Sequence, residues 1–432
     1  MVVEKSGFWC YALKQGVLVM TSRERVLTSC NHQEPDRVPI DFGGHRSSGI
    51  MALAYRDLRK ALGFPDSPLY VYDFIQQLAI VEDDVLDFFG VDVVDVGYLY
   101  YKNDWYWKDW VLPDGTPCKI PAFIEVEKTE EGWIVRGDEG QPICIQRPGC
   151  LYFEQCYFPL LDNPDQEFGR LEYYLKQIMW FRLGTPPAPA GFDAEGLRIH
   201  QENAAKVRQS TNRAIYATFG GNLLETAQFA FRMDNFLTEI ALNPPRVHHF
   251  LDKLVEYHLT NLEKYLDAVG PYVDIIGFGD DLGMQTGPQI SPKMYREFFK
   301  PRHALLWQTV KKKYPHLKVA LHCCGSIYQL LPDLIEAGLD IIQPVQIAAR
   351  DMEPERLKRE FGKDIVFWGG GCDTQTVLPF ATPQEVRAHV RRNLEIFAPS
   401  GGYVFQQVHN IMAGVPPQNI IAMFEEVHSF RY

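Results

Sequence analysis

The chain has 432 residues and a formal net charge of −12, from 43 Lys and Arg against 55 Asp and Glu. This acidic balance argues against a nucleic-acid partner, which requires a basic face. A hydrophobic content of 46% excludes a disordered chain, and no run reaches the roughly 18 apolar residues that a membrane span needs. The nine cysteines are scattered and form no disulfide framework, so we expect a cytoplasmic protein.

The chain start is predicted to lie outside the folded domain. Residues 1–19 contain an apolar piece but no signal-peptide pattern. The run Met20-Thr21-Ser22-Arg23-Glu24 is a more natural start, because it carries a helix N-cap. We therefore expect residues 1–19 to be an extension, either an upstream start or a disordered segment, and residues 20–432 to form one domain.

Short apolar, β-branched runs that end in Gly or polar residues alternate with helix-patterned segments along the chain. Near-continuous apolar runs are typical of parallel strands that are buried on both faces. Alternation of strand and helix in eight units predicts an α/β fold, a (β/α)₈ TIM barrel with right-handed crossovers. The candidate strands are 37–43, 91–97, 214–220, 273–279, 318–322, 339–343, 364–369 and 402–406.

One region interrupts this alternation. Residues 100–160 are rich in Trp, Tyr, Gly and Pro, with the turn pairs Asp114-Gly115 and Glu131-Gly132 between alternating runs. This pattern predicts a β-hairpin insertion after the second strand, where it can cover the site. Residues 164–210 then indicate two long helices. Further along, Gly338 is a predicted helix C-cap and Thr382 a predicted N-cap followed by Pro.

The fifth strand ends in a pair of candidate metal ligands. Residues two apart on a strand face the same side, so His322 and Cys324 can share a site while Cys323 points away. Imidazole and thiolate are ligands that zinc prefers. Cys372 and His409 follow the seventh and eighth strands and are the further candidate ligands. The alternative is a buried histidine with an inert buried cysteine.

Three carboxylates near other strand ends are candidate catalytic residues. Asp280 and Asp281 follow the fourth strand and can position a ligand or orient a metal-binding histidine. Glu225 lies just past the third strand. Helix capping and solvated loop positions are the alternatives for these side chains.

The loops also hold candidate substrate-binding residues. The 43–48 loop after the first strand offers backbone N–H groups with His45 and Arg46, which suit an anionic substrate. Gln346 and Asn410 follow the sixth and eighth strands. We expect these four side chains to line the substrate site.

Several segments, which together span nearly the whole chain from about residue 20, carry recognisable motifs. They are His322-Cys323-Cys324-Gly325-Ser326-Ile327, Phe367-Trp368-Gly369-Gly370-Gly371-Cys372-Asp373-Thr374-Gln375, His409-Asn410-Ile411, Val415-Pro416-Pro417-Gln418-Asn419-Ile420, Pro35-Asp36-Arg37-Val38-Pro39-Ile40-Asp41, and Asp280-Asp281-Leu282-Gly283 with Ile290-Ser291-Pro292. These segments resemble the uroporphyrinogen decarboxylase superfamily. The resemblance implies a (β/α)₈ barrel, in agreement with the predicted strands.

Within this superfamily the chain is more similar to the cobalamin-dependent methyltransferases than to the true decarboxylases. The decarboxylases carry an N-terminal Arg-Gln-Ala-Gly-Arg segment that binds the porphyrinogen carboxylates. This chain has Asp41-Phe42-Gly43-Gly44-His45-Arg46 there, without the arginine pair. In the methyltransferases, zinc is bound by His-x-Cys and a later Cys. His322 and Cys324 match the first two ligands, and the third is His409 by position or Cys372 by chemistry.

The resemblance implies a zinc-dependent methyltransferase. It would move a methyl group between an O-, N- or S-methylated small molecule and a corrinoid protein or free cobalamin. A homodimer is a further expectation. The first alternative is a decarboxylase that acts without metal on a different carboxylated substrate. The second is a non-catalytic corrinoid or tetrapyrrole binder.

Overall fold

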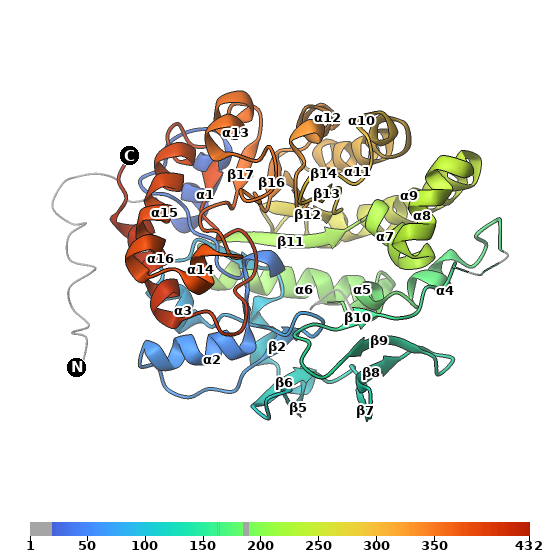
Figure 1. The fold of residues 1–432 in the computed structure, drawn as a ribbon, viewed down its shortest axis with the longest axis horizontal. Helices are drawn as coiled ribbons and strands as arrows, with labels where there is room; N and C mark the ends of the chain where they lie inside the picture. The colour runs from blue at the N-terminus through green and yellow to red at the C-terminus, as the bar shows by residue number, and fades with distance from the viewer. Residues whose placement is uncertain (1–19, 162, 164, 185–189) are drawn as a thin grey trace.

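The computed structural model describes residues 20–161, 163, 165–184 and 190–432, so the predicted extension at residues 1–19 lies outside the described residues. Its central element is a curled, seven-stranded parallel sheet (Figure 1). The strands are β4 (Val93–Asp95), β11 (Ala214–Gly220), β12 (Ile275–Gly279), β15 (Lys318–His322), β16 (Ile341–Gln343), β17 (Val366–Trp368) and β18 (Tyr403–Val404). Their spatial order is β18-β17-β16-β15-β12-β11-β4, and each lies within a predicted segment.

The first predicted strand, 37–43, forms an isolated bridge at the open side of this sheet. Ile40 pairs in parallel with Phe405, directly after β18. The backbone N–H of Asp92, directly before β4, donates to the Ile40 carbonyl at 2.8 Å. The segment therefore connects the two edge strands, and the mixed α/β architecture is consistent with a TIM barrel.

Alternate strand residues point into the space enclosed by the sheet. They form a buried cluster separate from the larger core between sheet and helices, and Val26 and Cys30 of α1 (Ser22–Cys30) belong to it. Its strand members are Val93, Ala214, Tyr216, Ile275, Ala320, Ile341, Val366, Trp368 and Val404. Because side chains alternate along a strand, His322 lies on the same inner side as Ala320.

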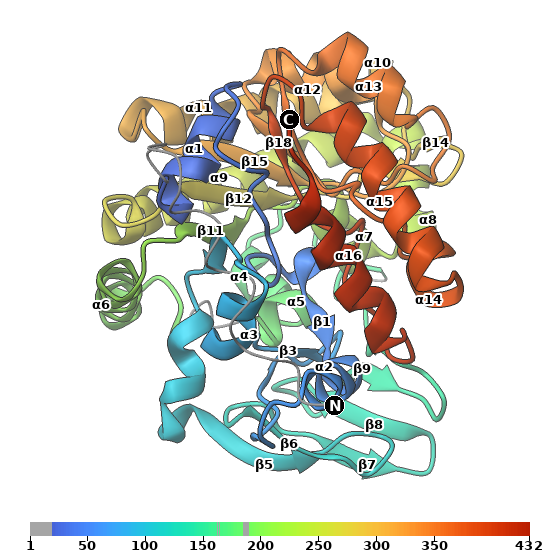
Figure 2. The same ribbon diagram turned by 90° about the vertical axis from the view of Figure 1, so that its left-hand side faces the viewer.

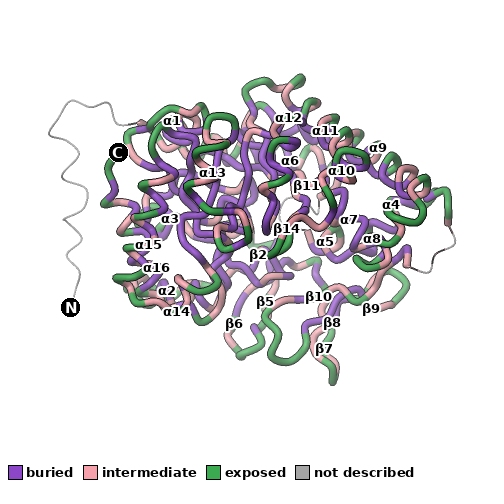
Figure 3. The backbone as a smooth tube through the Cα atoms, turned by 45° about the horizontal axis from the view of Figure 1, so that its top comes forward, coloured by how far each residue is buried: buried purple, intermediate pink, exposed green. Residues whose placement is uncertain are grey.

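Helices cover the outer face of the sheet (Figure 3), where the strands themselves are buried. The predicted caps are confirmed: Thr21 and Thr382 form capping boxes, and Gly338 ends its helix in the left-handed region, at φ 110°. The helices of the barrel half are α7 (Leu224–Phe231), α8 (Met233–Leu242), α9 (Pro244–Val269), α10 (Pro292–Met294), α11 (Lys300–Lys313), α12 (Leu331–Ala337), α13 (Pro354–Phe361), α14 (Val377–Phe380), α15 (Pro383–Phe397) and α16 (Pro417–Ser429).

The prediction of two long helices over 164–210 is wrong. The described part of this region contains one long helix, α6 (Ala194–Ser210), and two short ones, α4 (Leu171–Leu175) and α5 (Met179–Arg182). The short helices begin without a side-chain cap, whereas the Asp193 side chain accepts the Gly196 N–H at the start of α6. Without a cap, a short helix depends on its packing, which the sequence pattern does not report.

Antiparallel strands lie beside the barrel, toward the bottom of Figures 1 and 2. Between β4 and β11 they form a two-stranded and a four-stranded sheet, so a single hairpin does not describe the 100–160 region. A third small sheet, near α2 (Ala52–Ala61) and α3 (Asp83–Phe88), was not predicted. The strands are β5 (Trp107–Val111), β6 (Pro117–Pro121), β7 (Glu127–Thr129), β8 (Gly132–Arg136), β9 (Pro142–Gln146), β10 (Glu154–Gln155), and β1 (Ile50–Met51), β2 (Val71–Asp73) and β3 (Leu78–Ala79).

Three aspartates stabilise the amino-terminal ends of the parallel strands through hydrogen bonds and ion pairs. Asp92, Asp274 and Asp340 each directly precede a strand, and each carboxylate accepts a backbone N–H at 2.9 Å, from Ile40, from Ile215 of β11 and from Val319 of β15 respectively. Each also binds at least one cation: Arg25 and Arg37 on Asp92, Arg23 and Arg208 on Asp274, and Lys311 on Asp340. These contacts fix the strand register at this rim.

Among the described residues, no helix combines the length and the apolar character needed to cross a membrane.

Candidate metal centre

Three side chains come together at the carboxyl ends of the strands. His322 is the last residue of β15, Cys324 lies two residues further along the chain, and His409 lies in the loop after β18. One ligand atom from each residue lies within 4.8 Å of the other two, and the Cys324 Sγ is 3.5 Å from the His322 Nε2. Within the part of the chain that the structure describes, this is the only His, Cys, Asp and Glu group with such spacing.

A chain of amides fixes the orientation of His322. The Gln343 Nε2 donates to the Gln406 Oε1 at 2.9 Å, so the Gln343 Oε1 is the acceptor that faces the His322 Nδ1 at 3.2 Å. The Nδ1 therefore carries the ring proton, and the Nε2 is left with a free lone pair on the side of Cys324. This arrangement is typical of the hydrogen bonds that orient metal-binding histidines.

His409 is oriented in the same way. Its Nδ1 lies 2.7 Å from the Asn410 Oδ1, and the Asn410 amide donates to the Gln76 Oε1 at 2.9 Å. The Tyr152 hydroxyl also donates to the Asn410 Oδ1, at 3.1 Å. The His409 Nδ1 is thus the donor to Asn410, and its Nε2 is free. Asn410, which is predicted to bind substrate, orients this histidine in the structure.

Burial keeps both imidazoles neutral. Desolvation lowers the pKa of His322 to about 4, and desolvation together with the nearby His322 lowers the pKa of His409 to about 4. Desolvation and the Asp281 carboxylate raise the pKa of the Cys324 thiol well above its usual value. A metal ion at this point would meet two neutral imidazoles and one thiol that gives up its proton on ligation.

Asp281 supports the loop that carries Cys324. Its Oδ1 accepts the Cys324 backbone N–H at 2.6 Å and lies 3.9 Å from the His322 Nε2. On the other side, the Gln346 Oε1 accepts the Gly325 N–H at 2.8 Å. Asp281 and Gln346 therefore bind the two successive backbone N–H groups on either side of the Cys324 side chain. Gln346, which is predicted to bind substrate, makes this backbone contact in the structure.

The other two predicted catalytic carboxylates lie farther from the three ligand atoms. Asp280 is fully buried, caps the start of α7 through the N–H groups of Leu224 and Glu225 at 3.0 and 2.9 Å, and lies 3.2 Å from the His303 Nε2. Glu225 accepts the Asn222 amide at 2.6 Å. Desolvation and then Asp281 raise the pKa of Glu225 well above its usual value. Asp280 thus has the capping contact that was one of its two predicted roles.

His45 and Arg46 border the centre on the side of the first strand. The His45 ring lies 5.1 Å from the His322 ring and 5.3 Å from the Tyr216 ring, measured between centroids. The Arg46 guanidinium lies 4.9 Å from the centre of the Trp180 ring and 3.5 Å from Asp73. Both predicted side chains are thus beside the centre, with Arg46 already paired to a carboxylate.

Cys372 does not join the three ligand residues. Its side chain is fully buried, and its Sγ lies 3.8 Å from the Asp373 carbonyl. The geometry therefore favours His409, the residue that matches by position, over Cys372, which matches by chemistry.

Sequence reasoning did not assign the amides that orient the histidines. The position of Gln343 could have been predicted from strand alternation, since it lies two residues after the inward-facing Ile341 and ends β16. Gln76 and Tyr152 have none, because they are more than 250 residues from Asn410 along the chain.

Comparison with known proteins shows the family of the chain. Residues 194–430, more than half of the chain, match the family model described as uroporphyrinogen decarboxylase (URO-D). The chain therefore belongs to the uroporphyrinogen decarboxylase family. It is 39% identical over 220 residues to a uroporphyrinogen decarboxylase of Thioalkalivibrio sulfidiphilus, which covers 50% of this chain and 56% of that protein.

A uroporphyrinogen decarboxylase of Microcystis aeruginosa is 22% identical over 189 residues, 44% of this chain and 49% of that protein. The chain thus spans about half the length of these two relatives. A solved methyltransferase from Methanosarcina mazei superposes with a TM-score of 0.55 over 94% of this chain and 98% of that chain, at 16% identity. This likeness shows a shared fold.

Proposed function

We propose that the protein is a zinc-dependent methyltransferase that moves a methyl group between a methylated small molecule and a corrinoid protein or free cobalamin. The observation that carries the proposal is the geometry of His322, Cys324 and His409, whose ligand atoms lie within 4.8 Å of one another. Both histidines are held through Nδ1, and the His322 Nε2 lies 3.5 Å from the sulfur. Two imidazole nitrogens and one thiolate leave a fourth position open, as in catalytic zinc sites.

The chain's own residues would bind and orient. Gln343 and Asn410 fix the ring orientation of the two histidines, and Asp281 places Cys324 through its backbone N–H. The His45 ring covers one side of His322 and limits access of water there. When bound, zinc supplies a Lewis acid to the oxygen, nitrogen or sulfur that carries the methyl group, and the corrinoid supplies the cobalt that carries it onward.

The rival function is a decarboxylase that needs no metal. The curated relatives are uroporphyrinogen decarboxylases, which favours this reading. The residues at the first strand oppose it, since Gly43-Gly44-His45-Arg46 supplies a single arginine, already paired with Asp73.

Metal analysis and a cobalamin assay separate the candidates. We expect the purified protein to hold about one zinc ion per chain, as structural and catalytic zinc sites do. With cob(I)alamin and a panel of methanol, methylamines, aryl methyl ethers and methyl thioethers, one donor class should give the methylcobalamin spectrum, and His322→Ala should not. A protein without zinc that releases CO₂ from a carboxylated substrate, unaffected by His322→Ala, would contradict the proposal. Cobalamin binding with no methyl transfer from any donor would favour the non-catalytic binder.

A further inference from the structure

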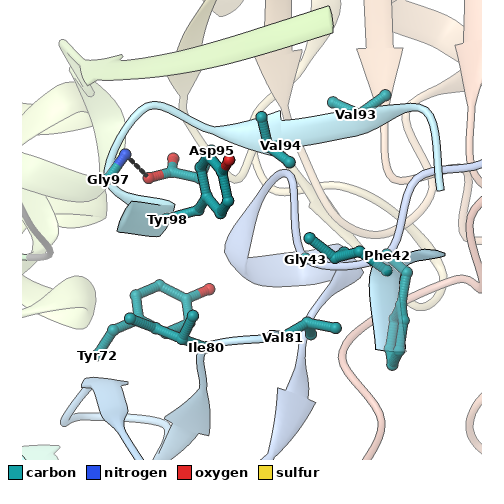
Figure 4. Close-up of a pocket in the computed structure, with 11 residues that line it drawn as sticks. Phe42, Gly43, Tyr72, Ile80, Val81, Val93, Val94, Asp95, Gly97 and Tyr98 are labelled. Carbon is teal, nitrogen blue, oxygen red and sulfur yellow. Dashed lines mark hydrogen bonds between the residues drawn. The ribbon is translucent and has the colours of Figure 1, made fainter. Parts of the chain in front are cut away.

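The loop that carries His45 holds its backbone through local hydrogen bonds. It follows Phe42 and Gly43, which line a narrow space together with the end of β4 (Figure 4). The Ser48 hydroxyl accepts the His45 N–H at 3.0 Å and donates to the His45 carbonyl at 2.8 Å. The turn therefore sets the His45 ring beside His322, with 5.1 Å between the two ring centres.

The two ring nitrogens of His45 have different roles. The Ser47 backbone N–H donates to the His45 Nδ1 at 3.2 Å, and the Ser47 Oγ lies 3.0 Å from the same atom. A nitrogen that accepts from a backbone N–H carries no proton, so the ring is neutral and its proton is on Nε2. This Nε2–H has no acceptor among the described residues, although His45 is only 4% exposed. An unmet donor at this depth is costly and marks a place for an acceptor on a ligand.

A continuous chain of hydrogen bonds joins His45 to His322 and gives the two rings opposite tautomers. The Ser47 hydroxyl, whose proton is directed to His45, accepts from the Gln406 Nε2 at 3.3 Å. The Gln406 Oε1 accepts from the Gln343 Nε2 at 2.9 Å, and the Gln343 Oε1 accepts from the His322 Nδ1 at 3.2 Å. Every donor in this chain is directed from His322 toward His45. His322 is thereby left with a lone pair on Nε2, and His45 with a proton on Nε2.

We propose that His45 is a catalytic residue that donates a hydrogen bond from Nε2 to the oxygen or sulfur that carries the methyl group. The tautomers separate the roles of the two neighbouring rings. A neutral imidazole binds a metal through its lone pair, whereas an N–H binds a substrate atom that offers a lone pair. The catalytic role rests on the proposed function, whereas the tautomer of His45 does not.

Such a donor selects a class of methyl compound. When the C–O or C–S bond breaks, its electron pair stays on the oxygen or sulfur, and the methyl carbon bonds to the electron pair of the cobalt(I) that the corrinoid supplies. The His45 N–H then faces a developing anion, so its hydrogen bond strengthens in the transition state. The anion finally takes a proton from water. A methylated ammonium nitrogen has no lone pair for this donor, so we expect O-methyl or S-methyl compounds as substrates.

The tautomer can be measured without any activity. Nitrogen-15 NMR of the full-length protein, labelled at the histidine ring nitrogens, shows which nitrogen of each ring carries the proton. His45→Gln assigns the His45 signals, and His428 is an internal standard, because its Nε2 donates to the Phe89 carbonyl at 2.9 Å. At neutral pH His45 should show the Nε2–H form, both with zinc and after chelation. The Nδ1–H form or a doubly protonated ring would overturn the proposal.

Methyl transfer tests the donor itself. His45→Phe keeps a flat ring without an N–H and should lower kcat about 100- to 1,000-fold, as loss of one oxyanion-hole donor does, with the zinc content unchanged. His45→Gln places an amide N–H near the position of Nε2 and should recover part of the rate. His428→Gln is the matched control and should keep the parent rate. Equal losses in His45→Phe and His45→Gln, or a loss of zinc in His45→Phe, would overturn the role as a donor to substrate.

The two measurements distinguish failure of this inference from failure of the proposed function. If His45 has the Nε2–H form but no methyl compound is a substrate, the proposed function and the catalytic role both fall. If methyl transfer is unaffected by His45→Phe, or is as fast from methylammonium compounds as from ethers and thioethers, the proposed function stands and the inference is overturned.

Discussion

The two rims of the parallel sheet use the same kinds of polar residue in opposite ways. At the amino-terminal rim, Asp92 is fully buried, yet its oxygens bind Arg25, Arg37 and the Ile40 N–H. At the carboxyl-terminal rim, His322 and His409 are anchored through Nδ1, the His322 Nε2 lies 3.5 Å from the Cys324 sulfur, and His409 belongs to the same group of ligand atoms. Groups satisfied within the chain stabilise the fold, whereas groups held in place with a free donor atom are suited to bind a ligand.

The largest loss in the free energy of unfolding is expected from a substitution at the amino-terminal rim. Asp92→Ala removes a carboxylate from Arg25, which keeps Asp36, from Arg37, which keeps two backbone carbonyls, and from the Ile40 N–H. Removing one partner of a buried ion pair costs about 3–5 kcal/mol. Chemical denaturation should show a loss of that size in the free energy of unfolding. The folded fraction should keep its zinc. If Asp92→Ala lost zinc but kept the stability of the parent protein, the amino-terminal rim would not be specialised for stability and the carboxyl-terminal rim for metal binding.

At the carboxyl-terminal rim, substitution of a metal ligand should abolish zinc binding and have a smaller effect on stability. His322→Ala should remove zinc, with a loss of affinity beyond the 10- to 100-fold that follows removal of a supporting hydrogen bond. Thermal stability of the metal-free protein should fall less than in Asp92→Ala, because the substitution removes one hydrogen bond of a neutral ring, from Nδ1 to Gln343, and breaks no ion pair. Cys372→Ala is the matched control, and zinc analysis by mass spectrometry should find it as full as the parent. If Cys372→Ala empties the site and His409→Ala does not, the assignment of the third ligand is wrong.

A smaller effect is expected from the amide that orients His322. Gln343→Leu keeps the volume of the side chain but removes the acceptor for the Nδ1 proton, which should weaken zinc binding about 10- to 100-fold. Competition with a zinc-binding dye measures the affinity, and the absorption spectrum of the cobalt(II)-substituted protein reports the ligand geometry. Gln343→Glu restores an acceptor and should recover most of the affinity. A purely structural Gln343 would show equal losses in both variants.

The sequence predicted the site residues best where strand alternation continues unbroken. His322 and Cys324 are two apart at the end of β15, so their shared side follows from the pleat. Cys372 follows Gly369 and Gly370, which have φ of 118° and 72°. These left-handed residues end the alternation, so the direction of the Cys372 side chain could not be extrapolated from β17.

The fold, like the site, could be predicted only where the signal is local in the sequence. Seven strands and the caps at Thr21, Gly338 and Thr382 lie where residue patterns place them, because burial and capping are local signals. The residues that orient the site are set by distant partners: Asn410 depends on Gln76 and Tyr152. No local pattern encodes such contacts.

The smallest loss of stability is expected at Asp340, the most exposed of the three aspartates at the amino-terminal rim. Asp340 binds Lys311, and the two side chains are 23% and 37% exposed, against 0% and 5% for Asp92 and Arg25. Asp340→Asn removes the charge and keeps an oxygen for the Val319 N–H, so the loss should be about 0–1 kcal/mol, as for solvent-exposed ion pairs. Added salt should reduce this loss further and leave the Asp92→Ala loss nearly unchanged, since buried pairs are screened much less. Denaturation of both variants at low and high salt measures the difference. Equal losses for the two variants would show that burial of the ion pair does not set how much it stabilises this rim.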